Sequence, residues 1–154
     1  MEIVAGARFT DMLDGEELGG MAKSMDQALK NAGILPSQVD YICADAASQP
    51  TMDAAEAKMI RRVFGAHADH IPVSSIRGVM GHALAAAGLM QLVTLAMVLK
   101  YRLIPPTANL TDPDPACDLQ HVQFQPLRAC VDIAIANARG MAKENSTLVV
   151  RRIP

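Results

Sequence analysis

The chain has very few aromatic residues and no excess of charge of either sign. Its 154 residues include no Trp, two Tyr and three Phe. Single-stranded nucleic acid is bound on aromatic stacking platforms, and nucleic-acid-binding domains in general carry a basic patch or stripe. With 14 Lys and Arg against 16 Asp and Glu, the net charge is −2. The composition therefore argues against nucleic acid as a partner.

Cysteine is also scarce. Cys43, Cys117 and Cys130 are odd in number and include no Cys-x-x-Cys pair, so a disulfide framework is not expected. We expect buried free thiols in a cytoplasmic protein, any of which would be a nucleophile only beside a base. Residues 1–4 lack the basic and apolar segments of a signal peptide.

The histidines do not suggest a metal site. His67 and His70 are three residues apart, but a transition-metal site needs three or four ligands and no third one is apparent. We expect a solvated loop at this position. We also expect no metal or cofactor in the chain as a whole.

One long segment has almost no polar residues. Residues 83–99 read as a helix in which only Gln91 and Thr94 are polar, whereas a surface helix keeps a polar side. Such a helix would be about 26 Å long, slightly short of the roughly 30 Å hydrocarbon core of a membrane. It also lacks an aromatic belt and a one-sided Lys or Arg flank. We therefore expect no membrane span, and a helix buried with the help of another polypeptide.

The hydrophobic periodicity predicts an alternation of strands and helices that ends in two strands. This order is typical of a layered α/β sheet, and it suggests one domain over residues 1–154 or one half of a larger domain. The predicted strands are 2–12, 39–46, 71–76, 130–136 and 146–153, and the predicted helices are 18–32, 53–64 and 83–99.

Four segments resemble motifs of the β-ketoacyl synthases. Residues 73–88 read Val-Ser-Ser-Ile-Arg-Gly-Val-Met-Gly-His-Ala-Leu-Ala-Ala-Ala-Gly, similar to that family's Lys- and His-bearing segment. Residues 41–57, 105–119 and 137–150 resemble its His-Gly-Thr-x-Thr segment, its Pro-Pro-Thr-x-Asn-Leu loop and its Gly-rich C-terminal signature. The resemblance implies the C-terminal half of a thiolase-like fold, a layered αβα unit with a mixed five-stranded sheet. Residues 83–99 would be its central helix, covered by the other half.

The resemblance also implies a chemistry. Ketosynthases hold an acyl chain as a thioester on a cysteine of the other half, and two histidines assist decarboxylation of a malonyl thioester by donating hydrogen bonds to the oxyanion. His82 matches the second histidine. At a helix N-terminus its imidazole would be held neutral and able to donate. The alternative is that His82 merely caps a buried helix.

The other matched positions depart from the family pattern. Asp45 stands in place of the first histidine, and a carboxylate cannot donate unless it is protonated. Arg77 replaces the lysine, and Gln91 replaces the glutamate that pairs with it. Arg139 and Met141 replace the two phenylalanines that gate the acyl pocket, where a buried arginine would be costly. These substitutions predict a degenerate active site.

We therefore expect a non-catalytic subunit, similar to a chain-length factor, in fatty-acid or polyketide synthesis. It would complete the fold and shape the acyl pocket of a partner that carries the cysteine, either an N-terminal half or a full ketosynthase subunit. One alternative is half of an active split synthase that uses His82. In that context Asp45, Arg77 and His82 form either an ion-paired structural cluster or a new catalytic set.

A second alternative is a docking module for an acyl carrier protein or a related synthase. Two pairs of arginines, Arg61–Arg62 and Arg151–Arg152, are candidates to meet the acidic surface of a carrier protein. Each pair also has a simpler interpretation as part of a solvated face.

Overall fold

The computed structural model describes residues 1–11 and 19–153. Its centre is a six-stranded sheet with the order β1-β8-β7-β2-β3-β5. β2, β3, β5 and β7 are parallel to their neighbours among these four, whereas β8 runs antiparallel to both β7 and β1. The strands are β1 (Glu2–Thr10), β2 (Tyr41–Cys43), β3 (Pro72–Ser74), β5 (Gln120–His121), β7 (Ile133–Arg139) and β8 (Glu144–Arg151).

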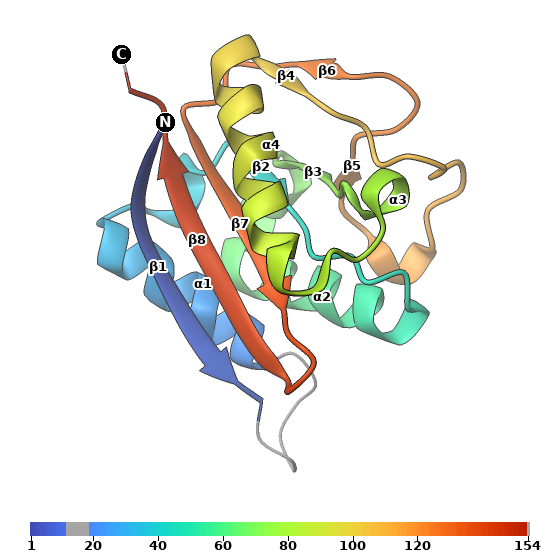
Figure 1. Cartoon of the computed structure of the whole chain (residues 1–154), viewed down its shortest axis with the longest axis horizontal. Coiled ribbons are helices and arrows are strands. Elements are labelled where there is room, and N and C mark those ends of the chain that lie inside the picture. The colour runs from blue at the N-terminus through green and yellow to red at the C-terminus, as the bar shows by residue number, and fades with distance from the viewer. Residues whose placement is uncertain (12–18, 154) are drawn as a thin grey trace.

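Helices cover both faces of this sheet (Figure 1). Helices α1 (Gly19–Ala32) and α2 (Pro50–Phe64) lie on one face, and α4 (Ala87–Tyr101) lies on the other, with the one-turn helix α3 (Arg77–Met80) beside it. A short antiparallel pair, β4 (Leu103–Ile104) and β6 (Leu127–Arg128), follows the end of α4. The layered mixed α/β architecture is as predicted.

Each face of the sheet has its own apolar core, because strand side chains alternate between the two faces. On the α1 and α2 side, side chains from both helices pack on the sheet, and on the other side α4 contributes three residues. The first core includes Met21, Met25, Met59, Ile60, Ile135 and Val149, and the second includes Tyr41, Leu95, Val98, Leu99 and Val150.

The strand predictions were correct in position but wrong in extent. The sheet has six strands rather than five, because residues 120–121 pair with β3 at its edge. The strand predicted over 39–46 is limited to Tyr41–Cys43. Past it, Ala46 and Ser48 have φ of 40° and 60°, and this left-handed backbone turns the chain out of the sheet. Position 12 of the first predicted strand and position 18 of the first predicted helix lie outside the described residues.

The continuous helix predicted over 83–99 is also interrupted. A 3-10 turn covers Leu84–Ala86, and α4 begins only at Ala87. Gly81 and Leu84 have φ of 66° and 49°, a left-handed conformation that cannot continue a right-handed helix. The prediction missed this break because the composition of the segment is uniformly apolar.

The prediction that the chain cannot cover its own apolar helix agrees with the structure. Leu89, Val93, Met97 and Tyr101 are spaced four residues apart along one side of α4, and each remains 50–65% exposed. Residues 84–101 are long and apolar enough to cross a membrane by length and composition. The opposite side of α4, however, packs against the sheet, and the α-helix itself would span only about 22 Å.

Candidate functional site

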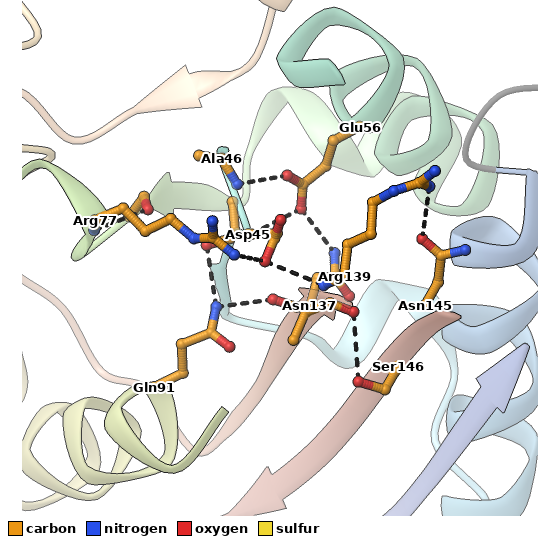
Figure 2. A network of polar contacts seen from close by, with 12 residues as sticks. Asp45, Ala46, Glu56, Arg77, Gln91, Asn137, Arg139, Asn145 and Ser146 are labelled. Atoms are coloured by element: carbon orange, nitrogen blue, oxygen red, sulfur yellow. Dashed lines mark hydrogen bonds and ion pairs between the residues drawn. The ribbon is translucent and has the colours of Figure 1, made fainter. Parts of the chain in front are cut away.

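The predicted site residues gather at the carboxyl ends of the parallel strands, where α/β sheets bind their ligands. Asp45 follows β2, Arg77 follows β3 at the start of α3, and Arg139 is the last residue of β7. Figure 2 shows how these three residues, from different parts of the sequence, meet around the carboxylate of Asp45.

Asp45 is at the centre of this cluster and is only 4% exposed. Its Oδ1 accepts a hydrogen bond from the guanidinium of Arg77, with which it forms an ion pair, and another from the backbone N–H of Arg139 at 3.1 Å. Burial raises the pKa of Asp45, although the charge of Arg77 and both hydrogen bonds oppose this shift. The carboxylate is thus committed to partners within the chain.

Glu56 of α2 extends the network on the side of Asp45 that faces α2, above Asp45 in Figure 2. Its carboxylate accepts the backbone N–H groups of Asp45 and Ala46 at 3.0 and 2.8 Å and the Nδ2 of Asn137 at 3.3 Å. Burial and the nearby charge of Asp45 raise the pKa of Glu56 to about 7. Sequence reasoning did not identify this role. The sequence did contain a signal for it, because Glu56 is an acidic residue on the same side of α2 as Met59 and the other buried residues of that helix.

Gln91 does not take over a pairing role toward Arg77. Its Nε2 donates to the backbone carbonyls of Ala44 at 3.2 Å and Asn137 at 2.8 Å, which links α4 to β7 and to the end of β2. Within the described chain its Oε1 has no hydrogen-bond partner. A cavity of about 10 Å³ adjoins Gln91 and Arg77, about the room that one water requires.

Arg139 turns away from Asp45 with its side chain. Its Nη1 donates to Asp11 at 2.5 Å and to the Oδ1 of Asn145 at 3.2 Å. Burial raises the pKa of Asp11, but the N–H of Gly20, Asn145 and the Arg139 guanidinium outweigh it, so the net pKa is lowered. The arginine is therefore paired in this structure, and the predicted cost of leaving it unpaired in an apolar tunnel does not arise.

His82 and Met141 lie outside the hydrogen-bonded network. His82 is exposed in the link between α3 and the 3-10 turn, so the prediction that it opens the long helix was wrong. No hydrogen bond to its ring is formed within residues 1–11 and 19–153. It is near enough for its positive charge to lower the pKa of Asp45, as a minor effect. Met141 lies in the turn between β7 and β8 and is 88% exposed.

The cysteines are free, as predicted, but only one of them is buried. Burial raises the pKa of Cys43 to about 12 and also raises that of Cys117, so neither is an activated thiolate. The His121 ring lies 2.6 Å from the carbonyl oxygen of Cys117, a contact that does not involve the thiol. Cys130 is exposed, and its sulfur lies 2.9 Å from Arg102.

A larger cavity adjoins the network on the side of Glu56 and Ala46. It has a volume of about 500 Å³ and is bounded by α2, by the ends of β2 and β3 and by residues 107–121. Its lining residues include Asp53, Glu56, Asp112 and Asp114 but not Arg77, His82 or Arg139. In the described residues no group of three or more His, Cys, Asp or Glu is arranged to hold a metal ion.

The arginines considered for carrier-protein docking are mostly neutralised by the chain itself. Arg61, Arg151 and Arg152 form ion pairs with nearby carboxylates at 2.6–2.8 Å, and exposed charges satisfied in this way add little to a field that steers a partner. The pairs are Arg61 with Asp69 and Asp118, Arg151 with Glu2, and Arg152 with Asp132.

Comparison with known proteins agrees with this geometry. Residues 5–111 match the family described as "Beta-ketoacyl synthase, C-terminal domain". Over 137 residues the chain is 38% identical to the 3-oxoacyl-[acyl-carrier-protein] synthase 2 of Coxiella burnetii (strain RSA 493 / Nine Mile phase I), covering 89% of this chain and 33% of that protein. The chain therefore spans about a third of the length of this curated relative.

Solved structures give the same result. One is described as a type II PKS acyl-carrier protein in complex with its ketosynthase bound to the hexaketide. It aligns with a TM-score of 0.93 at 31% identity, over 99% of this chain and 38% of the other. The ishigamide ketosynthase/chain length factor aligns with a TM-score of 0.92 over the same shares, at 23% identity, which shows a common fold. The match covers only the C-terminal part of a ketosynthase.

Proposed function

The chain belongs to the β-ketoacyl synthase family, of which it carries the C-terminal domain, and we propose that it is a non-catalytic, ketosynthase-like subunit. In this proposal it completes the thiolase-like fold of a partner polypeptide that carries the catalytic cysteine. It also shapes that partner's acyl pocket, as a chain-length factor does. The setting is fatty-acid or polyketide synthesis in the cytoplasm.

One observation carries the proposal. Asp45, which stands where the family has a hydrogen-bond-donating histidine, is buried and paired with Arg77 while it accepts the N–H of Arg139. A carboxylate in this state cannot donate a hydrogen bond to a developing oxyanion, and its negative charge repels an enolate. Protonation would free a donor only by breaking the ion pair.

The exposed side of α4 supports the second part of the proposal. Isolated apolar residues are common on protein surfaces, but a continuous row of large ones is typical of a surface that meets another molecule. Leu89, Val93 and Met97 form such a row on a helix that the sequence predicts to be enclosed. A polypeptide with the missing cysteine would both cover this row and supply the nucleophile.

The first test measures catalysis. The chain is purified alone and together with the cysteine-bearing ketosynthase polypeptide encoded nearest to its own gene, native masses are recorded, and malonyl-thioester decarboxylation is assayed. We expect no activity from the chain alone. We expect a stable complex whose activity is unchanged by His82→Ala and by the matched control His70→Ala, which alters an exposed histidine outside the site.

The competing function is that of an active half-synthase, and it is favoured by the exposed ring of His82, which is accessible to a substrate. If His82→Ala lowers the rate of the complex by about 10²–10⁴-fold while His70→Ala does not, His82 is a catalytic group and the non-catalytic proposal is wrong. Activity of the chain alone would also contradict it.

A further inference from the structure

The apolar side of α4 is bordered by an unusual distribution of charge. We define the α4 face by Leu89, Val93, Met97 and Tyr101, the exposed row described above. Exposed apolar residues also occur in the elements that come directly before and after α4 in the chain. These are Val79 and Met80 of α3, Leu84 of the 3-10 turn and Leu103 of β4.

Carboxylates are absent from the segments that build this surface. None of the 16 acidic residues of the chain falls within residues 70–111, which contain α3, α4 and β4, or within residues 119–131, which contain β6. The basic residues that border the α4 face therefore have no acidic neighbour in their own segments.

Two of these basic residues lie at the C-terminal end of the α4 face. Lys100 is exposed, with its Nζ 5.0 Å from the centre of the Tyr101 ring. Arg128 of β6 is exposed and pairs in register with Leu103. Neither forms an ion pair with any residue that the structure describes. At the other end of the face, Arg77 is already neutralised by Asp45.

From this distribution we infer that the partner of the α4 face is a different polypeptide rather than a second copy of this chain. The partner presents an apolar helix or strand face bordered by Asp or Glu residues that meet Lys100 and Arg128. The inference rests on the proposed function, because it specifies the partner that completes the fold.

A second copy fits this surface poorly. A twofold dimer through the α4 face would use the same surface on both subunits, so each would offer apolar and basic groups but no carboxylate. If the two α4 helices run parallel in such a dimer, the two Lys100 side chains approach each other, and if they run antiparallel, Lys100 of one copy approaches the N-terminal end of the other α4. That end carries the positive pole of the helix dipole. Charged side chains buried without a counter-ion weaken an interface.

The test compares charge reversal with loss of the apolar row. Calorimetry measures the binding of the cysteine-bearing ketosynthase that is encoded nearest to the gene of this chain. The unaltered chain is compared with the double variant Lys100→Glu/Arg128→Glu and with Val93→Asp. The control is Lys23→Glu, which alters an exposed lysine of α1 on the opposite face. We expect the double reversal to weaken binding by about tenfold or more, mainly through slower association. Val93→Asp should abolish binding, and Lys23→Glu should leave it unchanged.

Salt provides a second readout. Raising the ionic strength from 0.05 to 0.5 M, concentrations chosen for the assay, should weaken binding of the unaltered chain but not of the double-reversal variant. Binding that is insensitive both to charge reversal and to salt would overturn the inference while leaving the proposed function standing. If no ketosynthase binds, the proposed function fails.

Self-association is measured separately by sedimentation of the isolated chain. A monomer that also binds the ketosynthase in a charge-sensitive manner supports the inference. A stable dimer that dissociates when Val93→Asp is introduced would show that a second copy occupies the α4 face, and would overturn it.

Discussion

The coupling between Asp45 and Glu56 predicts an unusual pH dependence of stability. The pKa of Glu56 is raised from 4.5 to about 7 by burial and by the charge of Asp45, a shift that corresponds to about 3 kcal/mol. A carboxyl group whose pKa is higher in the folded state binds its proton more tightly there. Its contribution to stability is therefore fully present below pH 4.5 and is lost as the pH rises through 7.

The informative perturbation is Asp45→Asn. Removing the charge of Asp45 removes one of the two causes that raise the pKa of Glu56, so the decline in stability between pH 4.5 and 7 should become shallower. The same substitution leaves the guanidinium of Arg77 without its counter-ion, which costs about 3 kcal/mol for a buried pair. The variant should thus be less stable at every pH and also less sensitive to pH.

The assay is urea unfolding at several pH values between 4.5 and 7.5, with Asp118→Asn as the control. The side chain of Asp118 is 79% exposed, so its removal should leave the slope of unfolding free energy against pH unchanged. A variant Asp45→Asn with the same slope as the unaltered chain would refute the proposed coupling, even if its overall stability fell as expected.

Two further predictions concern packing. Leu95→Ala removes a fully buried side chain beneath α4 and should lower the free energy of unfolding by about 2–5 kcal/mol. Leu89→Ala, on the exposed side of α4, should change the free energy of unfolding of the isolated chain by less than about 0.5 kcal/mol. An equal loss for both in thermal unfolding would mean that α4 is oriented differently. Gly78→Ala should be clearly destabilising, because the added Cβ would lie 2.6 Å from the carbonyl oxygen of Ala108. A Cβ at Gly88 would meet nothing within 4 Å, so Gly88→Ala should stabilise α4 by up to about 1 kcal/mol. Equal melting temperatures for the two glycine variants would contradict this packing.

The layered fold followed from patterns that are local in sequence. The strands and helices appear in the predicted order, because amphipathic periodicity and the apolar run over residues 83–99 record which side of each element is buried. The ends of the elements were less accurate. The backbone turns at Ala46 and Leu84 depend on left-handed conformations that these residue types adopt only when the surrounding structure imposes them.

The candidate site was only partly predictable. The resemblance to the β-ketoacyl synthases assigned Asp45, Arg77 and Arg139 to active-site positions, and in the structure Asp45 contacts the guanidinium of Arg77 and the backbone N–H of Arg139. Reasoning from the sequence did not identify Glu56, which lies within hydrogen-bond distance of the site only because α2 packs across the end of β2. Nor did it show that Arg139 pairs with Asp11, a contact between residues at opposite ends of the chain.

The sequence by itself determined two properties of this protein: that it belongs to the family of β-ketoacyl synthase C-terminal domains, and that its apolar helix exceeds what its own residues can cover. Both depend on residue type and spacing, which are local information. Only the tertiary structure decided which charges neutralise each other. Ion pairs form between residues brought together by the packing of the sheet and its helices, so the closed network around Asp45 and the unpaired charges beside α4 are visible only in three dimensions.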